Sequence, residues 1–332
     1  MLLKKTDLLV TARTLILFNF HEIHIEVSSK CTLKCPRCPR TELKPEQLNQ
    51  EISLAEFRSA FPSDVLAFIH TFAFCGDVGD PIYATEFLDI IKYLKINNKT
   101  VRIVTNGSYK SHEWWSELGN MLTEHDNVTF SVDGWGQASN EQYRVNSNFK
   151  SICNGLTSLR AASGCNITWS TIIFKFNEDN LTTIENLAKS LGVDHFQTVN
   201  STKFGNQYLV SGVDPLQPVL VNPTNSYIKY QTNLTNRPEP LVFKQKTNGH
   251  KWAKCLNWET RPFINVDGLV FPCAWFNSGY QENDFVQKYK DKLNIKTRSL
   301  ADIVADPIWE EFQTRLELAP LEICKIKCKN DR

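Results

Sequence analysis

The sequence predicts an α/β protein whose parallel sheet curves into a partial (β/α)6 barrel, followed by a small cysteine-rich C-terminal domain. Three observations predict this fold. Strand-like and helix-like segments alternate six times between residues 22 and 200, which is the pattern of a parallel sheet with right-handed crossovers. Residues 201–250 are rich in Asn, Pro, Thr and Gln and show no clear period. Four of the ten cysteines then follow residue 250.

Each expected strand is a short apolar run, and a segment with apolar residues on one helical face follows it. The strands are expected at residues 23–27, 65–74, 101–104, 127–132, 167–176 and 193–199. Ser53 and Glu56 form a capping-box pattern that opens the first helix. Gly192 stands where the C-cap glycine of the last barrel helix belongs. In such sheets, ligands bind at the carboxyl ends of the strands.

The C-terminal part predicts a β-hairpin and a helix. Residues 263–271 alternate around Asp267-Gly268, a dipeptide typical of a hairpin turn. A last helix is expected from 299 to 318, with a break or kink at Pro307. We therefore divide the chain into an N-terminal extension (1–21), a barrel core (22–200), a bridging segment (201–250) and a C-terminal domain (251–332).

Composition argues against several classes of protein. Of the 332 residues, 42% are hydrophobic and 22% are charged, which is ordinary for a soluble globular protein. The net charge of +1 predicts no strong attraction to nucleic acid or to an anionic membrane. No stretch approaches the roughly 18–20 apolar residues of a membrane span, and the start has no signal-peptide pattern. We expect a cytoplasmic protein without a membrane partner, and no nucleic-acid partner.

The first cysteine set follows the first expected strand directly. Cys31, Cys35 and Cys38 have the spacing C-x3-C-x2-C. Three thiolates on one short loop can hold three irons of a [4Fe–4S] cluster and leave the fourth iron open to a small molecule. The alternative is a zinc site, but structural zinc usually takes four ligands, and no nearby His or Cys supplies a fourth. Clustered short spacings in a chain of this size favour metal ligation over disulfides.

The second set contains the four cysteines after residue 250, namely Cys255, Cys273, Cys324 and Cys328. Four thiolates are the number that fully ligates one [4Fe–4S] cluster. Taken alone, these cysteines also permit a four-cysteine zinc knuckle. The remaining cysteines stand apart, and we expect Cys153 and Cys165 to be packed as small apolar residues.

The first set resembles the signature of radical S-adenosylmethionine (radical SAM) enzymes. In that family, the amino and carboxylate groups of the methionine part of SAM chelate the open iron. The second expected strand ends in Gly76-Asp77-Val78-Gly79-Asp80-Pro81, which resembles the family's glycine-rich motif at this place. The resemblance implies that the backbone of Gly76, Asp77, Gly79 and Asp80 holds the methionyl ammonium. Asp80 stands where the family usually has Glu, so the charge is kept.

The next strand ends also resemble family motifs. Asn106 lies in Thr-Asn-Gly after the third strand, and Ser131 and Asp133 lie in Ser-Val-Asp-Gly after the fourth. The resemblance implies that these side chains lie near the ribose of SAM. It also implies that Arg144 meets the SAM carboxylate, since a guanidinium matches both carboxylate oxygens; the alternative is a surface arginine on a helix. Arg37 departs from the family, because an aromatic residue near the adenine commonly precedes the third cysteine.

The second set resembles the SPASM/twitch extension found in one branch of this family. Cys255, twelve residues, Gly268, four residues and Cys273 fit its opening pattern. A full SPASM region carries seven cysteines and two auxiliary clusters, so four cysteines resemble a twitch domain with one auxiliary [4Fe–4S] cluster. The resemblance thus implies a partial TIM-like barrel with a reactive cluster and a twitch domain made of a β-hairpin and a helix.

We therefore expect a radical SAM enzyme. An external one-electron donor such as flavodoxin or ferredoxin would reduce the first cluster. SAM would then split to methionine and a 5′-deoxyadenosyl radical, which removes hydrogen from a small-molecule or peptide substrate. The auxiliary cluster would assist electron transfer or bind substrate. Only about 30 residues precede Cys31, too few for a fused peptide-leader-binding domain, which weakens the peptide interpretation. The alternative is a non-catalytic iron–sulfur or zinc-binding interaction protein on a degenerate barrel.

Overall fold

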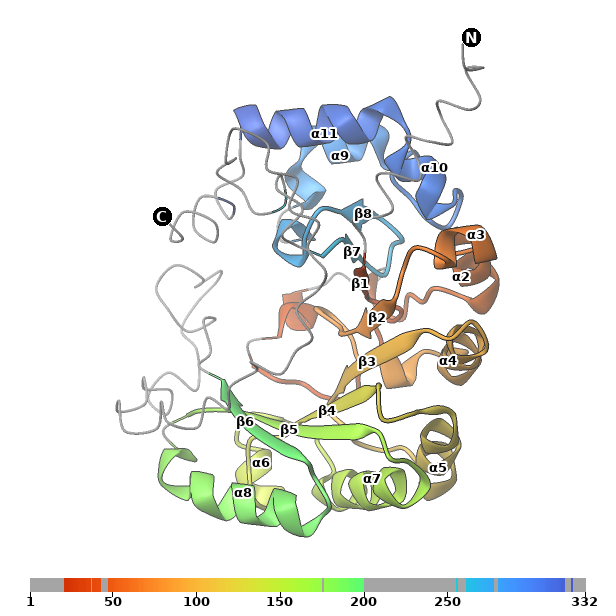
Figure 1. The fold of residues 1–332 in the computed structure, drawn as a ribbon. Coiled ribbons are helices and arrows are strands. Elements are labelled where there is room, and N and C mark those ends of the chain that lie inside the picture. Colours follow the sequence, from red (N-terminus) through yellow and green to blue (C-terminus); the bar gives the residue numbers. More distant parts are fainter. Residues whose placement is uncertain are drawn as a thin grey trace, which may run out of the picture.

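An open, mostly parallel eight-stranded sheet forms the centre of the fold (Figure 1). The computed structural model describes residues 21–36, 38–42, 47–174, 176–199, 255, 261–277, 280–319 and 324. The strands are β1 (Glu22–Ile25), β2 (Thr71–Phe74), β3 (Thr100–Thr105), β4 (Asn127–Ser131), β5 (Asn166–Ile172), β6 (His195–Val199), β7 (Phe263–Ile264) and β8 (Val270–Phe271). Their order is β6-β5-β4-β3-β2-β1-β7-β8, and only the β7–β8 pair is antiparallel. The predicted α/β class is confirmed.

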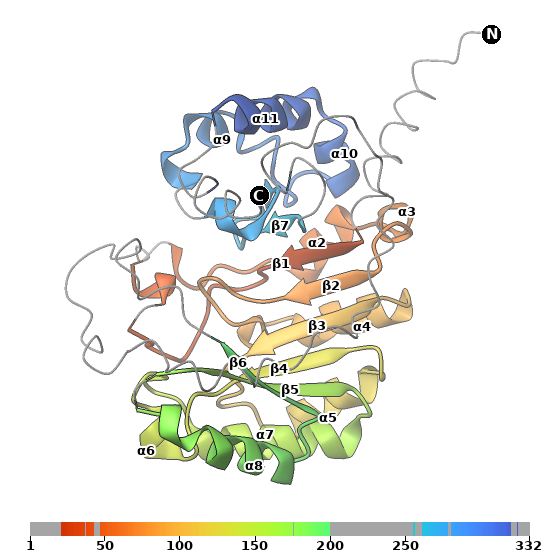
Figure 2. The same ribbon diagram turned by 60° about the vertical axis from the view of Figure 1, so that its left-hand side comes forward.

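Helices connect the strands and gather again over the C-terminal hairpin (Figure 2). Between the barrel strands lie α2 (Leu54–Ala60), α3 (Ser63–Leu66), α4 (Phe87–Ile96), α5 (His112–Met121), α6 (Gln137–Asn140), α7 (Phe149–Ala162) and α8 (Leu181–Ser190). The C-terminal part contains α9 (Asp284–Tyr289), α10 (Leu300–Val304) and α11 (Pro307–Leu318). Short 3-10 turns lie at Pro39–Glu42, Pro81–Tyr83, Glu178–Asn180, Ala274–Asn277 and Tyr280–Glu282. No helix in the described part of the chain is long and apolar enough to cross a membrane.

The two faces of the sheet differ in polarity. In β1 and β2, half-buried residues alternate with fully buried ones. Phe72 and Phe74 point to the outer face, where they contact the ring of Phe57 from α2, and Phe74 also contacts Phe87 from α4. The inner face stays half-buried and carries polar side chains such as His24. A parallel sheet covered on both faces would be apolar on both, so the polar inner face is the side that remains open to a ligand.

Several local predictions are confirmed. Ser53 accepts a hydrogen bond from the amide of Glu56, and the Glu56 carboxylate accepts one from the amide of Ser53. Gly192 follows α8 with φ +82°, and Gly268 turns the hairpin with φ +88°, a conformation that favours glycine. The last helix is broken into α10 and α11, and Pro307 occupies the first turn of α11.

The second strand is shorter than predicted. The expected strand at 65–74 is observed only at Thr71–Phe74. Pro62 precedes a helical turn, α3, that buries Val65 and Leu66, and this turn takes up the first apolar residues of the run. A short apolar run does not distinguish a buried strand from a buried helical turn, which explains the error.

The fifth strand also ends early, at Ile172 rather than at 176. Asn177 closes a turn there, because its Nδ2 donates to the carbonyl of Ile172 and its Oδ1 accepts from the amide of Phe174. Side-chain bonds of Asn to nearby backbone compete with strand pairing. The other four expected barrel strands agree with the observed ones to within two residues at each end.

The C-terminal hairpin extends the barrel sheet. β7 lies parallel to β1, with His24 opposite Phe263, and the amide of Glu26 donates to the carbonyl of Ile264 at 2.8 Å. The hairpin therefore brings the C-terminal part beside the strand that leads into the first cysteine set. The expected N-terminal extension, apart from its last residue, and the bridging segment 201–250 lie outside the described residues.

Candidate functional site

The loop that follows β1 gathers the first three cysteines. The side chains of Cys31, Cys35 and Cys38 pack into one small cluster, together with Leu33, Tyr143, Phe174 and their neighbours. The amide of Cys38 donates to the carbonyl of Cys35 at 3.1 Å, which turns the chain between these two ligands. The three predicted ligands thus lie together at the carboxyl end of the sheet. Arg37 lies outside the described residues.

Two residues from other strand-end loops hold this loop in place. The hydroxyl of Tyr83 lies 2.8 Å from the hydroxyl of Thr32 and donates to the carbonyl of Ser108 at 2.7 Å. The side-chain amide of Asn146 donates to the carbonyl of Thr32 at 2.6 Å. The backbone of the cysteine loop is therefore fixed by residues that follow β2 and β4.

The environment of the thiols fits a multi-iron cluster. Burial, together with Asp80 and the other two thiols, raises the pKa of Cys31 to about 12. Burial raises the pKa of Cys35 to about 11, partly offset by Arg144. Because thiolates are the ligands, such thiols need nearby cations, which irons supply. Among the described residues, no group of three or more His, Cys, Asp or Glu side chains is arranged to hold a single metal ion. The fit to a multi-iron cluster rests on the donor set, which is three thiols on one short loop, with Cys35 buried and Cys31 and Cys38 half-buried.

The turn after β2 lies too close to the β1 backbone for side chains. A Cβ on Gly79 would lie 1.9 Å from the carbonyl oxygen of Ser28, and one on Gly76 would lie 1.8 Å from that of Gly79. Only glycine fits so close an approach. Glu26, near the end of β1, accepts a hydrogen bond of 2.6 Å from the amide of Val78, and burial raises the pKa of Glu26 to about 8. The turn predicted to bind the methionyl ammonium is therefore held in shape from the β1 side.

The carboxylate of Asp80 is occupied by donors from the protein. Its Oδ2 accepts from the amide of Asn106 at 2.7 Å, from Asn106 Nδ2 at 2.5 Å and from the hydroxyl of Thr105 at 3.0 Å. Its Oδ1 accepts from the amide of Ile82 at 3.2 Å. Burial raises the pKa of Asp80 to about 6, although these donors oppose the rise. Asp80 thus joins the glycine turn to the end of β3. Because its carboxylate is already bonded, the groups of this turn that can bind an ammonium are those of the backbone.

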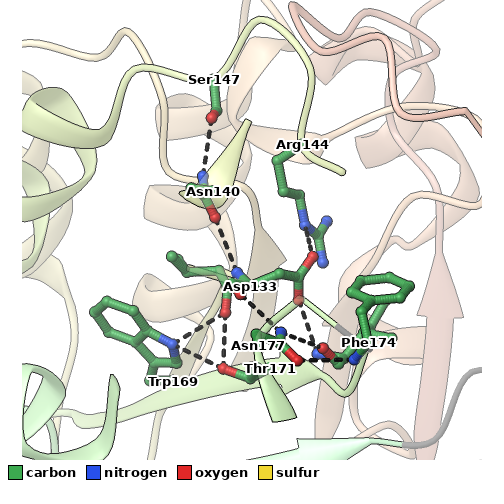
Figure 3. Close-up of polar contacts among 10 residues, drawn as sticks. Asp133, Asn140, Arg144, Ser147, Trp169, Thr171, Phe174 and Asn177 are labelled. Atoms are coloured by element: carbon green, nitrogen blue, oxygen red, sulfur yellow. Dashed lines mark hydrogen bonds and ion pairs between the residues drawn. The ribbon is translucent and has the colours of Figure 1, made fainter. Parts of the chain in front are cut away.

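A buried ion pair joins Asp133 to Arg144 (Figure 3). Arg144 Nε donates to Asp133 Oδ2 at 2.6 Å, and the amide of Ile172 donates to Asp133 Oδ1 at 2.7 Å. Asn140 and Asn177 bond to the backbone of Asp133. Burial has the largest single effect and lowers the pKa of Arg144, but Asp133, Cys35 and Tyr143 together raise it more, so the guanidinium stays charged. Among the described residues, no hydrogen-bond acceptor meets its two terminal nitrogens.

A row of polar side chains crosses the inner face beside this ion pair. Ser131 pairs in register with Ser170, and Ser170 with Gln197, so the three side chains share one face. Asn106 follows the end of β3 next to Ser131 and donates to Cys31 Sγ at 3.6 Å. Within the described part of the chain, nothing hydrogen-bonds to the side chains of Ser131, Ser170 or Gln197. The row can therefore bind a ligand that carries polar groups.

The second cysteine set is associated with the C-terminal core. Cys255 and Cys324 are buried in that core, and half-buried Cys273 packs against it. Cys273 directly precedes the 3-10 turn Ala274–Asn277. Cys328 lies outside the described residues. Three of the four predicted ligands therefore contact one hydrophobic core.

Comparison with known proteins supports an iron–sulfur domain at the C-terminal end of the chain. The SPASM family, described as an iron–sulfur cluster-binding domain, matches residues 255–329, a range that contains all four C-terminal cysteines. A tungsten-containing aldehyde ferredoxin oxidoreductase cofactor-modifying protein from Pyrococcus furiosus is 23% identical over 331 aligned residues, which cover 90% of this chain and 85% of that protein. Residues 255–329 thus match the SPASM family, and over most of its length the chain is similar to this cofactor-modifying protein.

Solved structures share the fold of this chain. SuiB from Streptococcus suis, bound to the precursor peptide SuiA, superposes with a TM-score of 0.61 at 13% identity, covering 91% of this chain and 69% of SuiB. The structure of anSMEcpe with bound AdoMet superposes with a TM-score of 0.54 at 18% identity, covering 92% of this chain and 82% of anSMEcpe.

Three residues of the candidate site were not found from the sequence. Glu26, Tyr83 and Asn146 hold the cysteine loop and the glycine turn in place, and none belongs to a motif. Of the three, only Glu26 could have been noticed in the sequence, because it is a carboxylate within the expected first strand. Tyr83 and Asn146 act across 51 and 114 residues, so no local pattern points to them.

Proposed function

We propose that this protein reductively cleaves SAM and abstracts a hydrogen atom from a substrate. Cys31, Cys35 and Cys38 would hold a [4Fe–4S] cluster whose fourth iron is chelated by SAM. Once bound, these cofactors supply the radical chemistry, which yields methionine and a 5′-deoxyadenosyl radical able to remove an unactivated hydrogen. The observation that carries the proposal is the packing of three thiols on one loop, between the glycine turn and Arg144.

The chain's own residues would position SAM. Asp133 fixes Arg144 through Nε, which leaves the two terminal nitrogens as a rigid fork for the SAM carboxylate. The backbone of Gly76–Gly79 would hold the ammonium. Asn106 and Ser131, at the ends of neighbouring strands, would lie near the ribose.

The C-terminal cysteines would hold a single auxiliary [4Fe–4S] cluster. Four thiols within the SPASM match support this number, with the ligands Cys255, Cys273, Cys324 and Cys328. This cluster would assist electron transfer or bind substrate. An external one-electron donor such as flavodoxin or ferredoxin would supply the electron that starts each reaction.

The substrate would be a polar molecule, either a peptide or a small molecule. The free side chains of Ser131, Ser170 and Gln197 support this, because hydroxyl and amide groups bind partners that carry amides or hydroxyls. SuiB was solved with a precursor peptide, whereas the Pyrococcus relative is named for modifying a cofactor. Both substrate classes therefore have support among the similar proteins.

Anaerobic reconstitution with iron and sulfide tests the proposal. We expect about eight irons per chain, a change in the paramagnetic signal of the reduced cluster when SAM is added, and release of 5′-deoxyadenosine after reduction. Zinc in place of iron, or a reduced cluster that never cleaves SAM, would instead support a non-catalytic metal-binding protein.

A further inference from the structure

The C-terminal part contacts the glycine turn directly. The side-chain amide of Asn277 donates to Asp77 Oδ2 at 3.3 Å, a contact that joins residues 200 positions apart. Asn277 ends the 3-10 turn that starts directly after Cys273. Asp77 lies between the two glycines of the turn after β2. The segment that carries one auxiliary ligand therefore touches the turn that we assign to SAM.

The contact extends into the hairpin. Asn277 Oδ1 accepts from Asn265 Nδ2 at 3.2 Å. Asn265 is itself fixed, since its Oδ1 accepts from the amide of Leu269 at 2.9 Å and its carbonyl accepts from the amide of Gly268. Each amide donates toward the glycine turn, and the Asp77 carboxylate, which only accepts, ends the chain. This arrangement gives the Asn265–Asn277–Asp77 chain a defined direction.

The turn is thus held from two sides. On the β1 side, Glu26 Oε1 accepts from the amide of Val78, and among the described residues nothing bonds to Glu26 Oε2. On the other side, Asn277 bonds to Asp77, the residue before Val78. Because the backbone of Asp77 and Val78 would face the SAM ammonium, a displacement of Asn277 shifts the groups that bind it.

We propose that Asn277 is a positioning residue through which the C-terminal iron–sulfur domain sets the shape of the SAM-binding turn. The inference rests on the proposed function of that turn. Coupling between two sites is reciprocal, so the order of the Cys273 segment and the affinity for SAM change together. The C-terminal domain then has a role in SAM binding that is separate from electron transfer.

A charge-swap cycle on the reconstituted full-length protein tests this role, with the dissociation constant for SAM as the measurement. Asn277→Asp places two carboxylates against each other, so we expect SAM binding to weaken at least tenfold. Asn277→Ala removes the donor and should weaken binding severalfold. Asp77→Asn keeps an acceptor for Asn277 but removes the negative charge, and its dissociation constant for SAM is the reference against which the double variant is compared.

The double variant Asp77→Asn/Asn277→Asp tests whether restoring the hydrogen bond between these two positions also restores SAM affinity. The carboxylate introduced at position 277 would accept from Asn265 and from the amide introduced at position 77. The bonds and the net charge are then restored, and binding should return to within twofold of the wild type. As a matched control, Asn294→Asp adds the same charge in the same domain, where Asn294 bonds to the hairpin carbonyl of Asp267. This control should leave the dissociation constant for SAM unchanged.

The outcomes separate this inference from the proposed function. If the wild type binds no SAM, the proposed function fails and the inference falls with it. If the wild type binds SAM and Asn277→Asp binds it equally well, only the inference is overturned. A swap variant that keeps wild-type iron content and melting temperature but does not regain SAM affinity also overturns it. Loss of auxiliary iron in Asn277→Asp would show that Asn277 serves the metal site instead.

Discussion

The two cysteine regions differ in how the chain brings their thiols together. The first set lies within residues 31–38, on one loop directly after β1. The second set is spread over residues 255–328, and the hairpin and α9 to α11 lie between its members. The entropy cost of closing a loop grows with its length, so the second set needs a folded domain before its ligands can meet. The first set needs only a short loop.

The contacts that hold the cysteines in place also differ between the two regions. The local loop is fixed from outside, by hydrogen bonds from Tyr83 and Asn146 on distant strand-end loops. The dispersed set is fixed by its own packing, with Cys255 and Cys324 buried in the core. Three ligands on one loop can leave one iron open to a ligand, whereas metal binding to ligands that meet only in the folded domain contributes to the free energy of folding. Metal loss should therefore affect reactivity at the first region and stability at the second.

Removal of each cysteine set has the largest expected effect. The Cys31/Cys35/Cys38→Ala variant should lose all SAM cleavage and keep about four irons. Alanine at all four C-terminal cysteines should also leave about four irons, with a larger fall in melting temperature, because that cluster is coupled to folding. Iron and sulfide counts, 5′-deoxyadenosine release and thermal unfolding measure the three quantities. Loss of all iron in the triple variant would contradict the division into two sites.

Substitution of Arg144 should have the next largest effect on SAM binding, and it acts at the first cysteine region alone. Arg144→Gln leaves the carboxylate of Asp133 buried without its partner, which costs on the order of 3–5 kcal/mol, and removes the fork for the SAM carboxylate. Adding Asp133→Asn should recover much of the stability but none of the SAM affinity. In the C-terminal part, Arg298 pairs with Asp306 at 3.0 Å, and Arg298→Gln should change neither SAM affinity nor 5′-deoxyadenosine yield.

Melting temperature and SAM binding, measured on the same preparations, separate the two roles of Arg144. If the Asp133→Asn/Arg144→Gln variant binds SAM as the wild type does, the guanidinium does not meet the SAM carboxylate. If Arg144→Gln is as stable as the wild type, Asp133 finds another partner and the ion pair is not what fixes this strand end.

The sequence predicted the features that depend on adjacent residues and missed the contacts between residues far apart in the chain. The capping box at Ser53, the break at Pro307 and the turn at Gly268 depend on a few adjacent residues, and all three are observed. The alternation of strands and helices was enough for the open parallel sheet. The second strand was overextended, because a run of apolar residues does not show where a helical turn ends and a strand begins.

The same distinction holds within the site. The cysteine spacings and strand-end motifs are local, so the sequence could nominate them. Asp80 was predicted as part of the turn whose backbone binds the ammonium, and the structure adds that its carboxylate is bonded to Asn106 and Thr105. Contacts such as Asn277 to Asp77 join distant parts of the chain, and one sequence contains no pattern that pairs them.

The smallest expected effect compares one tyrosine hydroxyl in each region. Tyr83→Phe removes the bonds to Thr32 and Ser108, and Tyr280→Phe removes the bond to Asp267 at the hairpin turn. A hydrogen bond of this kind contributes about 1 kcal/mol, equivalent to roughly a fivefold change in an equilibrium or a rate. Tyr83→Phe should therefore speed iron loss from the first cluster about fivefold, and Tyr280→Phe should do so only for the auxiliary cluster.

Iron release to a chelator under anaerobic conditions measures both rates, and the two alanine sets assign each kinetic phase to its cluster. Because the first loop depends on hydrogen bonds from outside it, Tyr83→Phe should also weaken SAM binding, whereas Tyr280→Phe should not. Equal acceleration of both phases by either variant would mean that the two regions lose metal in one cooperative step. The local loop and the dispersed set would then be parts of a single folding unit, despite their different routes through the sequence.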